Sequence, residues 1–224
     1  MEKSFHLAII CDGNRRWAKD RGLMPWDGHR KAVENFRNIG DWCRAHPRIG
    51  TLTLWGFSTE NWKRDEKEVS ELMRLFEWFM RSEIDHIVSS KTRFVHTGRK
   101  DRIPASLATL FIEAEEKTKH YTDFTIQLAI DYGGKDEVVR AVSTMAPGSK
   151  VTEESIRAHL DHPEVPDIDM VLRTSGEQRT SNFFLWQAAH AEWYFPTYHF
   201  PDLTPERLEE AITEYDGRKR RFGK

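Results

Sequence analysis

The sequence His6-Leu7-Ala8-Ile9-Ile10-Cys11-Asp12-Gly13-Asn14-Arg15-Arg16-Trp17 predicts both the fold of the chain and the place of its site. The apolar run 6–10 is typical of a buried β-strand, and the turn after it combines an acid, a glycine, an amide and two arginines. In an open parallel sheet, ligands bind beyond the carboxyl ends of the strands. Glycine lets the backbone approach a ligand, and arginine forks match phosphate oxygens. The alternative for this stretch alone is a strand–turn–helix junction with solvated arginines.

The composition is that of one charged globular domain, which we place over residues 1–224. The chain has 224 residues, 38% hydrophobic and 31% charged, with a net charge of -2. Because the overall charge has no basic bias, an anion site must be a local cluster, and we expect no nucleic-acid partner despite the basic run 218–224. Cys11 and Cys43 form no CxxC motif, so we expect a reduced protein without structural zinc.

The sequence contains no segment that reads as a membrane span or a signal peptide. A span needs about 18–20 consecutive apolar residues, and no run approaches that length. We therefore expect a cytoplasmic protein, and the question of peripheral membrane association stays open.

Strands and helices alternate along the chain, which predicts an α/β fold with a mainly parallel sheet flanked by helices. The stripe of apolar residues over 69–87 follows the helical period and is typical either of core packing or of the lining of an apolar tunnel. Asp27 is the predicted N-cap of a helix that would carry His29 in its first turn. The predicted strands are 6–10, 50–57, 92–97, 124–130, 169–172 and 193–195. Helical patterns lie over 29–43, 69–87, 104–119, 134–145, 182–191 and from 204, with a short helix beginning at Thr152.

Three polar clusters follow predicted strands, at 12–17, 58–64 and 173–181. In a parallel sheet these clusters share one edge, where their arginines would supply enough positive charge for two polyphosphate groups. Asp12 and Glu192 are the acids we expect to hold Mg²⁺, which binds through few carboxylates plus phosphate oxygens. GxxxxGK[ST], GxGxxG after the first strand, GxSxG and the DDxxD of trans-type prenyl-diphosphate synthases are all absent. The phosphate-binding candidates are Arg16, Arg64, Arg173, Arg179, Ser58 and Ser181.

The opening stretch resembles the first signature of the cis-prenyltransferases, the undecaprenyl-diphosphate synthase family. Further blocks of that family are matched in order along nearly the whole chain. These are Phe57-Ser58-Thr59-Glu60-Asn61-Trp62, Tyr132-Gly133-Gly134, the run 173–183 with Trp186 and Glu192, and the terminal Arg221-Phe222-Gly223.

The resemblance implies a six-stranded sheet with an apolar tunnel, a homodimer, and Mg²⁺-dependent condensation of an allylic diphosphate with isopentenyl diphosphate to a cis-polyprenyl diphosphate. It makes Asp12 the essential acid and a metal ligand, with Glu192 supporting the metal. It makes Asn61 the proton acceptor, although an amide is a very poor base and a substrate-positioning role suits it better. The product would partition to a membrane. The implied substrate-binding residues are Gly13, Asn14, Arg15, Arg16, Trp17 and His29, then Ser58, Thr59, Glu60, Trp62 and Arg64, then Arg173, Arg179, Thr180 and Ser181, with Arg221 completing the partner's site.

This chain departs from the family pattern at several positions. Pro25 stands where an arginine is usual, so Arg15 or Arg21 would have to replace that cation, and Gln178 stands where a metal-side histidine is common. Phe79 occupies a position that is small in undecaprenyl synthases, and there is no insertion between Arg64 and Arg99, so we expect a short- or medium-chain product. The alternatives are a head-to-middle, lavandulyl-type condensing enzyme and a non-catalytic accessory subunit, which would lack the acid at Asp12.

Overall fold

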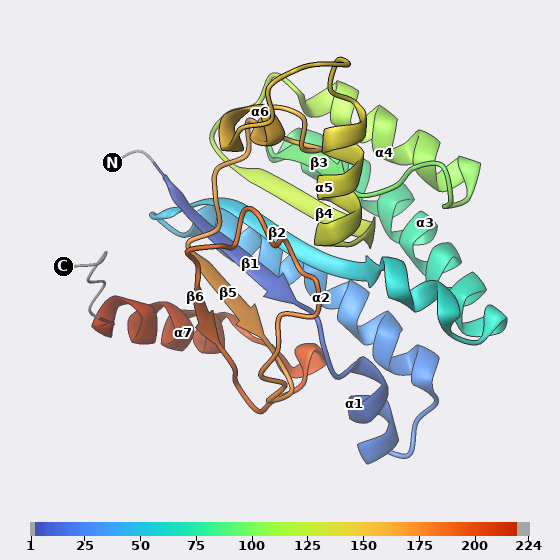
Figure 1. Cartoon of the computed structure of the whole chain (residues 1–224). Helices are drawn as coiled ribbons and strands as arrows, with labels where there is room; N and C mark the ends of the chain where they lie inside the picture. Colours follow the sequence, from blue (N-terminus) through green and yellow to red (C-terminus); the bar gives the residue numbers. More distant parts are fainter. Residues whose placement is uncertain (1–2, 219–224) are drawn as a thin grey trace.

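A six-stranded, all-parallel β-sheet forms the centre of the molecule (Figure 1). The computed structural model describes residues 3–218. The strand order is β3-β4-β2-β1-β5-β6, which places β1 between the two strands whose following loops carry the other arginine clusters. The strands are β1 Phe5–Ile10, β2 Ile49–Ser58, β3 Arg93–Thr97, β4 Thr125–Tyr132, β5 Met170–Arg173 and β6 Glu192–Tyr194.

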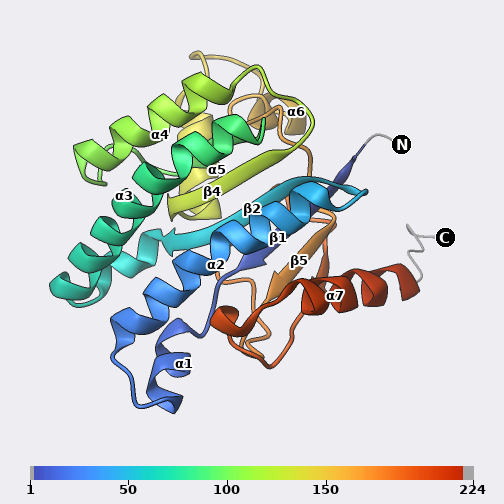
Figure 2. The same cartoon turned by 180° about the vertical axis from the view of Figure 1, so that it is seen from behind.

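Helices cover both faces of the sheet (Figures 1 and 2). One face packs against α2, α3, α4 and α7, and the other against α5 and α6. The helices are α1 Asn14–Asp20, α2 Pro25–Ala45, α3 Glu66–Ser89, α4 Ala105–Thr118, α5 Gly134–Ser143, α6 Glu153–Arg157 and α7 Pro205–Gly217, with short 3₁₀ helices η1 Thr59–Lys63 and η2 Phe200–Asp202. No helix among residues 3–218 has the length and apolar character to cross a bilayer.

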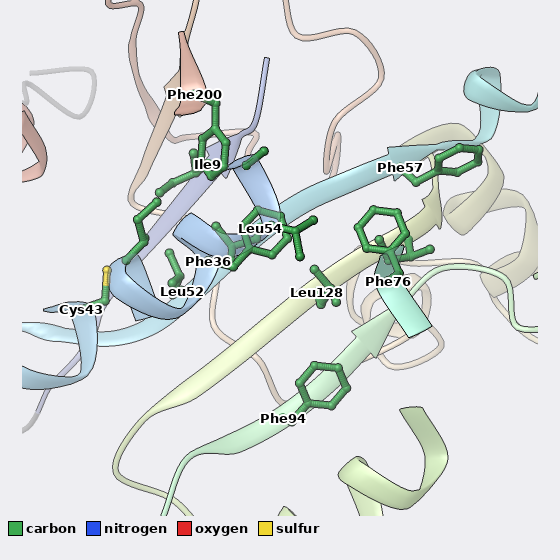
Figure 3. Close-up of a cluster of buried hydrophobic side chains, with 14 of the residues drawn as sticks. Ile9, Phe36, Cys43, Leu52, Leu54, Phe57, Phe76, Phe94, Leu128 and Phe200 are labelled. Atoms are coloured by element: carbon green, nitrogen blue, oxygen red, sulfur yellow. The ribbon is translucent and has the colours of Figure 1, made fainter. Parts of the chain in front are cut away.

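The larger core lies between the sheet and helices α2, α3 and α7. Alternate residues of β1 serve the two faces, since Leu7 and Ile9 belong to this core and Ala8 and Ile10 to the smaller one behind the sheet. Figure 3 shows Phe36 of α2 and Phe76 of α3 meeting Leu54 and Leu128 of the sheet in one layer. Because both faces are covered, β1 is a continuous apolar run, as its sequence predicted.

Three local predictions were wrong. The segment 182–191 is a series of turns rather than a helix, because Ser181, Asn182 and Phe184 adopt positive φ angles of 52°, 68° and 33°. The turn after Asp12 is itself the helix α1. Helix α2 begins at Pro25, so Asp27 lies inside its first turn, where its carboxylate accepts the Met24 N–H at 3.0 Å. His29 is therefore deeper in the helix and buried, with 9% of its surface exposed.

Candidate active site

The backbone of Asp12, at the end of β1, is fixed by the loop that follows β5. Its N–H donates to Thr174 Oγ1 at 3.0 Å, and its carbonyl accepts hydrogen bonds from the hydroxyls of Thr174, at 2.7 Å, and Ser175, at 3.0 Å. The Phe200 N–H donates to the same carbonyl at 3.0 Å. Next to it, Gly13 has a φ of 96°, and a Cβ there would lie 1.8 Å from Ser175 Oγ. The close packing of two strand-end loops therefore requires glycine at this position.

The side chain of Asp12 joins arginines from two loops. Its Oδ2 accepts from Arg173 Nη2 at 2.9 Å, and its Oδ1 from Arg16 Nη2 at 3.2 Å. The Arg173 side chain is only 5% exposed, and its other amine donates to Ser181 Oγ at 2.8 Å and to the Arg179 carbonyl. A guanidinium buried this deeply needs a carboxylate partner, so Asp12 and Arg173 hold each other in place.

Glu177 completes this cluster, which we call the Asp12 network: Asp12, Arg16, Arg173, Glu177 and Arg179. Glu177 Oε1 accepts from Arg16 at 2.8 Å, and Oε2 accepts from Arg179. The hydrogen bond from Arg179 is the main reason why the pKa of Glu177 lies below its ordinary value. With three arginines and two carboxylates, the network carries an excess positive charge and is suited to an anionic ligand.

A second charged cluster surrounds Glu68 on α3. Its carboxylate lies 3.0 Å from Arg64, 3.5 Å from Arg15 and 3.5 Å from His29 Nε2. Burial, and then the charge of Arg64, lowers the pKa of His29 to about 4, despite the opposing effect of Glu68. His29 is therefore neutral at pH 7, and among residues 3–218 Glu68, at 3.5 Å, is the nearest acidic group given for its buried Nε2, without the geometry of a hydrogen bond. Arg15, which was expected to replace a cation missing at Pro25, is instead placed beside Glu68, and Arg21 pairs with Asp202 at 3.2 Å.

The stretch Ser58–Trp62 is held against the end of β4 and against the turn segment that follows β5. Trp62 Nε1 donates to the buried carboxylate of Asp131 at 2.8 Å, and Asn182 Nδ2 donates to Glu60 at 3.1 Å. Asn61 Oδ1 accepts the Ser58 N–H at 3.0 Å and so closes the turn of η1. The oxygen of Asn61 is already a hydrogen-bond acceptor in the fold, which makes it less available to receive a proton.

An apolar cavity opens between α2 and α3, but no continuous tunnel is seen within residues 3–218. A cavity of about 820 Å³ is lined by Pro25, Trp26 and His29 on α2, by Leu72 and Leu75 on α3, and by charged residues of both helices and of the turn before α3. Farther along the same helices, a separate cavity of only about 40 Å³ is lined by Phe36 and Phe79, among others. The rings of Phe36 and Phe79 pack edge to face, 5.7 Å apart. The expected tunnel is therefore not shown, and it stays a prediction.

The two predicted metal ligands are not brought together within one chain. Asp12 follows β1, whose last residue Ile10 pairs with Arg173 at the carboxyl end of β5, whereas Glu192 pairs with Met170 at the opposite end. Three residues of strand separate these levels by about 10 Å. Glu192 forms an ion pair with Arg218 at 2.9 Å. Residues 3–218 contain no group of three or more metal-binding side chains. Asp12 still fits Mg²⁺, because that ion usually takes one or two carboxylates and completes its shell with phosphate oxygens and water.

The structure groups most of the predicted site residues at the carboxyl edge of the sheet. Trp17 is turned to another partner, donating from Nε1 to Asp202 at 2.8 Å, and Thr180 is exposed. Arg221 lies outside the described residues. Glu68, Glu177 and His199, which is 2.7 Å from Ser175 Oγ, were not predicted. The residues brought together are Asp12, Arg16, Arg173, Arg179 and Ser181 in the Asp12 network or against it, Arg15, His29 and Arg64 around Glu68, and Ser58, Thr59, Glu60, Asn61 and Trp62 at η1.

A parallel sheet with arginine-rich loops at its carboxyl edge, beside an apolar cavity, is the framework of an enzyme that handles amphipathic phosphate esters. Comparison with known proteins identifies the enzyme family to which this framework belongs. Residues 10–223 match the family model described as putative undecaprenyl diphosphate synthase. The chain belongs to this family and is a prenyltransferase.

Relatives cover the chain from end to end. The isoprenyl transferase of Treponema pallidum is 43% identical over 97% of this chain and 98% of its own length, and that of Aquifex aeolicus is 41% identical over 98% and 95%. Lavandulyl diphosphate synthase from Lavandula x intermedia, solved with dimethylallyl diphosphate, superposes with a TM-score of 0.93 at 34% identity, covering 99% of both chains. A probable undecaprenyl diphosphate synthase from Campylobacter jejuni superposes at 0.83 with 32% identity, covering 100% of both.

Gly13 provides a test of the close contact between the first and third loops. We expect Gly13→Ala to lower the free energy of unfolding by about 3 kcal/mol, because the methyl group adds a steric clash to left-handed backbone strain. Gly22→Ala is the matched control, since Gly22 has a φ of 67° but no atom within 4 Å of its Cβ position. We expect it to cost only about 1 kcal/mol in urea denaturation. Equal losses in the two variants would contradict the proposed contact.

Proposed function

We propose that this protein condenses isopentenyl diphosphate with an allylic prenyl diphosphate to form a (Z)-polyprenyl diphosphate. The observation that carries the proposal is the position of Asp12 between Arg16 and Arg173, at the carboxyl edge of the sheet. The apolar cavity between α2 and α3 supplies space for the hydrocarbon part of the substrate. A charged edge next to an apolar space matches the two halves of a prenyl diphosphate.

The allylic diphosphate is the leaving group, so its binding residues must stabilise negative charge as the C–O bond breaks. We assign this role to Arg16 and to the backbone around Gly13 and Asn14 at the start of α1. Asp12 would hold Mg²⁺ together with the diphosphate, and the ion would stabilise the charge that develops on the departing oxygens. The excess positive charge of the Asp12 network would also stabilise the negative charge that develops on the departing diphosphate.

Isopentenyl diphosphate is assigned to Arg173, Arg179 and Ser181. Arg173 and Ser181 are already hydrogen-bonded, at 2.8 Å, so the guanidinium is pre-oriented. A proton must leave after the new C–C bond forms. Asn61 is a poor acceptor, because it is an amide and its oxygen already accepts the Ser58 N–H. We therefore assign the proton to a diphosphate oxygen and give Asn61 a positioning role.

A head-to-middle condensation is the second candidate function. It is favoured by the TM-score of 0.93 against the lavandulyl diphosphate synthase structure, compared with 0.83 against the probable undecaprenyl diphosphate synthase. Such an enzyme would join two allylic diphosphates, and it would need no isopentenyl diphosphate.

Substrate requirement separates the two candidates. We expect labelled isopentenyl diphosphate to be incorporated when Mg²⁺ and an allylic starter of C5, C10 or C15 are supplied, and we expect no product from dimethylallyl diphosphate alone. Product extraction and chromatography measure both reactions. A product formed from dimethylallyl diphosphate alone, without incorporation of isopentenyl diphosphate, would replace the first candidate with the second.

Phe79 is proposed to limit the length of the product. It packs against Phe36 beside the smaller cavity, one turn of α3 beyond Leu75, which lines the larger cavity, so a chain growing from the larger cavity along α3 would meet these rings. We expect Phe79→Ala to shift the product distribution upward by at least one C5 unit, measured by chromatography. Trp78→Ala is the control, because Trp78 is on the same helix but 53% exposed. A C55 product from the wild type, or no change in Phe79→Ala, would contradict this role.

A homodimer is proposed because one chain leaves Glu192 far from Asp12. Both carboxylates can serve one metal only if Glu192 comes from the partner subunit. Arg218, the last described residue, pairs with Glu192, and in the sequence the basic residues that include Arg221 come directly after it. We place the dimer in the cytoplasm, with a product that partitions to the membrane.

Mixed dimers test this arrangement. We expect Asp12→Ala and Glu192→Ala each to lose nearly all turnover while keeping native secondary structure by circular dichroism at 25 °C, although Asp12→Ala also lowers the free energy of unfolding because the buried Arg173 loses its carboxylate partner. If the two acids act across the interface, re-equilibrating equal amounts of both variants restores about a quarter of the wild-type activity, because half the dimers contain one intact site. If both acids act in the same chain, every site keeps one defect, and mixing restores nothing.

A further inference from the structure

Three loops at the carboxyl edge of the sheet meet at Asn182, which follows Ser181 in the segment after β5. The backbone carbonyl of Asn182 accepts the N–H of Gly134 at 2.7 Å, and its Oδ1 accepts the N–H of Lys135 at 2.8 Å. Its Nδ2 donates to Glu60 Oε1 at 3.1 Å. The first two partners follow β4 and the third follows β2. One residue therefore connects the loops after β2, β4 and β5.

Asn182 caps helix α5 from a distant part of the chain. Gly134 and Lys135 are the first two residues of α5, and the residue before them, Gly133, has no side chain that could accept their N–H groups. The first N–H groups of a helix need an acceptor from outside it, and Asn182 supplies two. A Cβ on Gly133 would lie 2.8 Å from Asn182 Nδ2 and 2.6 Å from Thr59 Oγ1, so the three loops are in close contact here.

Helix α5 is also attached to the segment 182–187 at a second point. Glu137 of α5 is only 1% exposed, and its carboxylate accepts hydrogen bonds from Gln187 Nε2 at 3.1 Å and from the Tyr132 hydroxyl at 2.6 Å. Removing these donors would leave a buried carboxylate without partners, which is costly. The segment is therefore bound to α5 at both of its ends, and α5 is a fixed support for Asn182.

The backbone at Ser181 and Asn182 is strained. Their φ angles are 52° and 68°, in the left-handed region that residues other than glycine, asparagine and aspartate rarely adopt. Two consecutive residues persist in this region only where the surrounding structure holds them. The hydrogen bonds of Asn182 supply that hold, and with the loop in this shape Ser181 Oγ lies 2.8 Å from Arg173 Nη1. Without them, the backbone would relax and the Ser181 hydroxyl would leave Arg173.

We propose that Asn182 is a positioning residue for the reaction. It keeps Ser181 beside Arg173 and fixes this pair against η1, the turn that carries Asn61. The hydrogen bonds of Asn182 go to the loops after β2 and β4, whereas the allylic diphosphate is assigned to the loop after β1. The effect of Asn182 therefore falls on the binding of isopentenyl diphosphate. The assignment of each diphosphate to its loop rests on the proposed function.

Steady-state kinetics with each substrate varied in turn tests this role. We expect Asn182→Ala to raise the KM for isopentenyl diphosphate at least about tenfold, because the hydroxyl and guanidinium that bind it lose their fixed geometry. The KM for the allylic diphosphate should change by less than about twofold. If Asn182→Ala does not fold, Asn182→Asp takes its place in this comparison.

Thr152→Ala is the matched control, because it also removes a helix cap. Thr152 Oγ1 accepts the Ser155 N–H at 3.2 Å at the start of α6, which lies towards the opposite ends of the strands (Figure 1). Both KM values should equal those of the wild type. Equal increases in both KM values of the Asn182 variant, or the same increase in Thr152→Ala, would overturn the positioning role.

Hydrogen exchange without substrate tests the junction independently of the reaction. Asn182→Asp keeps an acceptor for Lys135 but places a carboxylate against that of Glu60, so the amides of η1 should exchange at least about fivefold faster. In E60Q/N182D the amide and the carboxylate exchange places, and the wild-type rates should return. Unchanged exchange in Asn182→Asp, or no recovery in the double variant, would overturn the proposal. A wild type that incorporates no isopentenyl diphosphate would instead contradict the proposed function, and hydrogen exchange would still decide whether Asn182 holds the loops together.

Discussion

The ion pair between Asp12 and Arg173 is the interaction on which the rest of the site depends. Arg173 ends β5 and is almost fully buried, so its guanidinium needs a charged partner, and the carboxylate of Asp12 supplies it at 2.9 Å. The pair connects the loop after β1 to the loop after β5. Hydrogen bonds from the hydroxyls of Thr174 and Ser175 to the Asp12 carbonyl connect the same two loops. Moving either loop would therefore break a buried charge pair and three hydrogen-bonding contacts together.

The glutamates of the two charged clusters hold the arginines of the site close together. Glu177 binds Arg16 and Arg179, and Glu68 lies among Arg15, Arg64 and His29. Without these carboxylates, arginines collected on one edge would repel one another and turn to solvent. A diphosphate carries more negative charge than one carboxylate and can take over its arginines without a large rearrangement. The glutamates thus keep the arginines close together until an anion arrives.

The sequence predicted the architecture because β1 is a continuous apolar run, the other strands are short runs rich in apolar residues, and polar turns follow β1, β2 and β5. Parallel pairing then places the turns after β1, β2 and β5 on one edge. It did not predict the shape of 182–191, because the positive φ angles of Ser181 and Asn182 are set by tertiary contacts, such as the Asn182 bond to Glu60. Glu68 and Glu177 were missed for a related reason. Each has one partner close in sequence, Arg64 for Glu68 and Arg179 for Glu177. Their other partners come from distant segments, and nothing in their local sequence distinguishes them from surface acids.

The direction of β6 explains why a single chain holds one of the two expected metal ligands at the site. A side chain at the carboxyl end of a parallel strand reaches the arginine edge, whereas Glu192 is the first residue of its strand and points to the other edge. The pairing of Met170 with Glu192 fixes this placement, because Leu172, two residues further along β5, pairs with Tyr194, the last residue of β6. No rearrangement of side chains within the chain can therefore bring Glu192 to Asp12. The geometry leaves the partner subunit as the source of the second carboxylate in the proposed dimer.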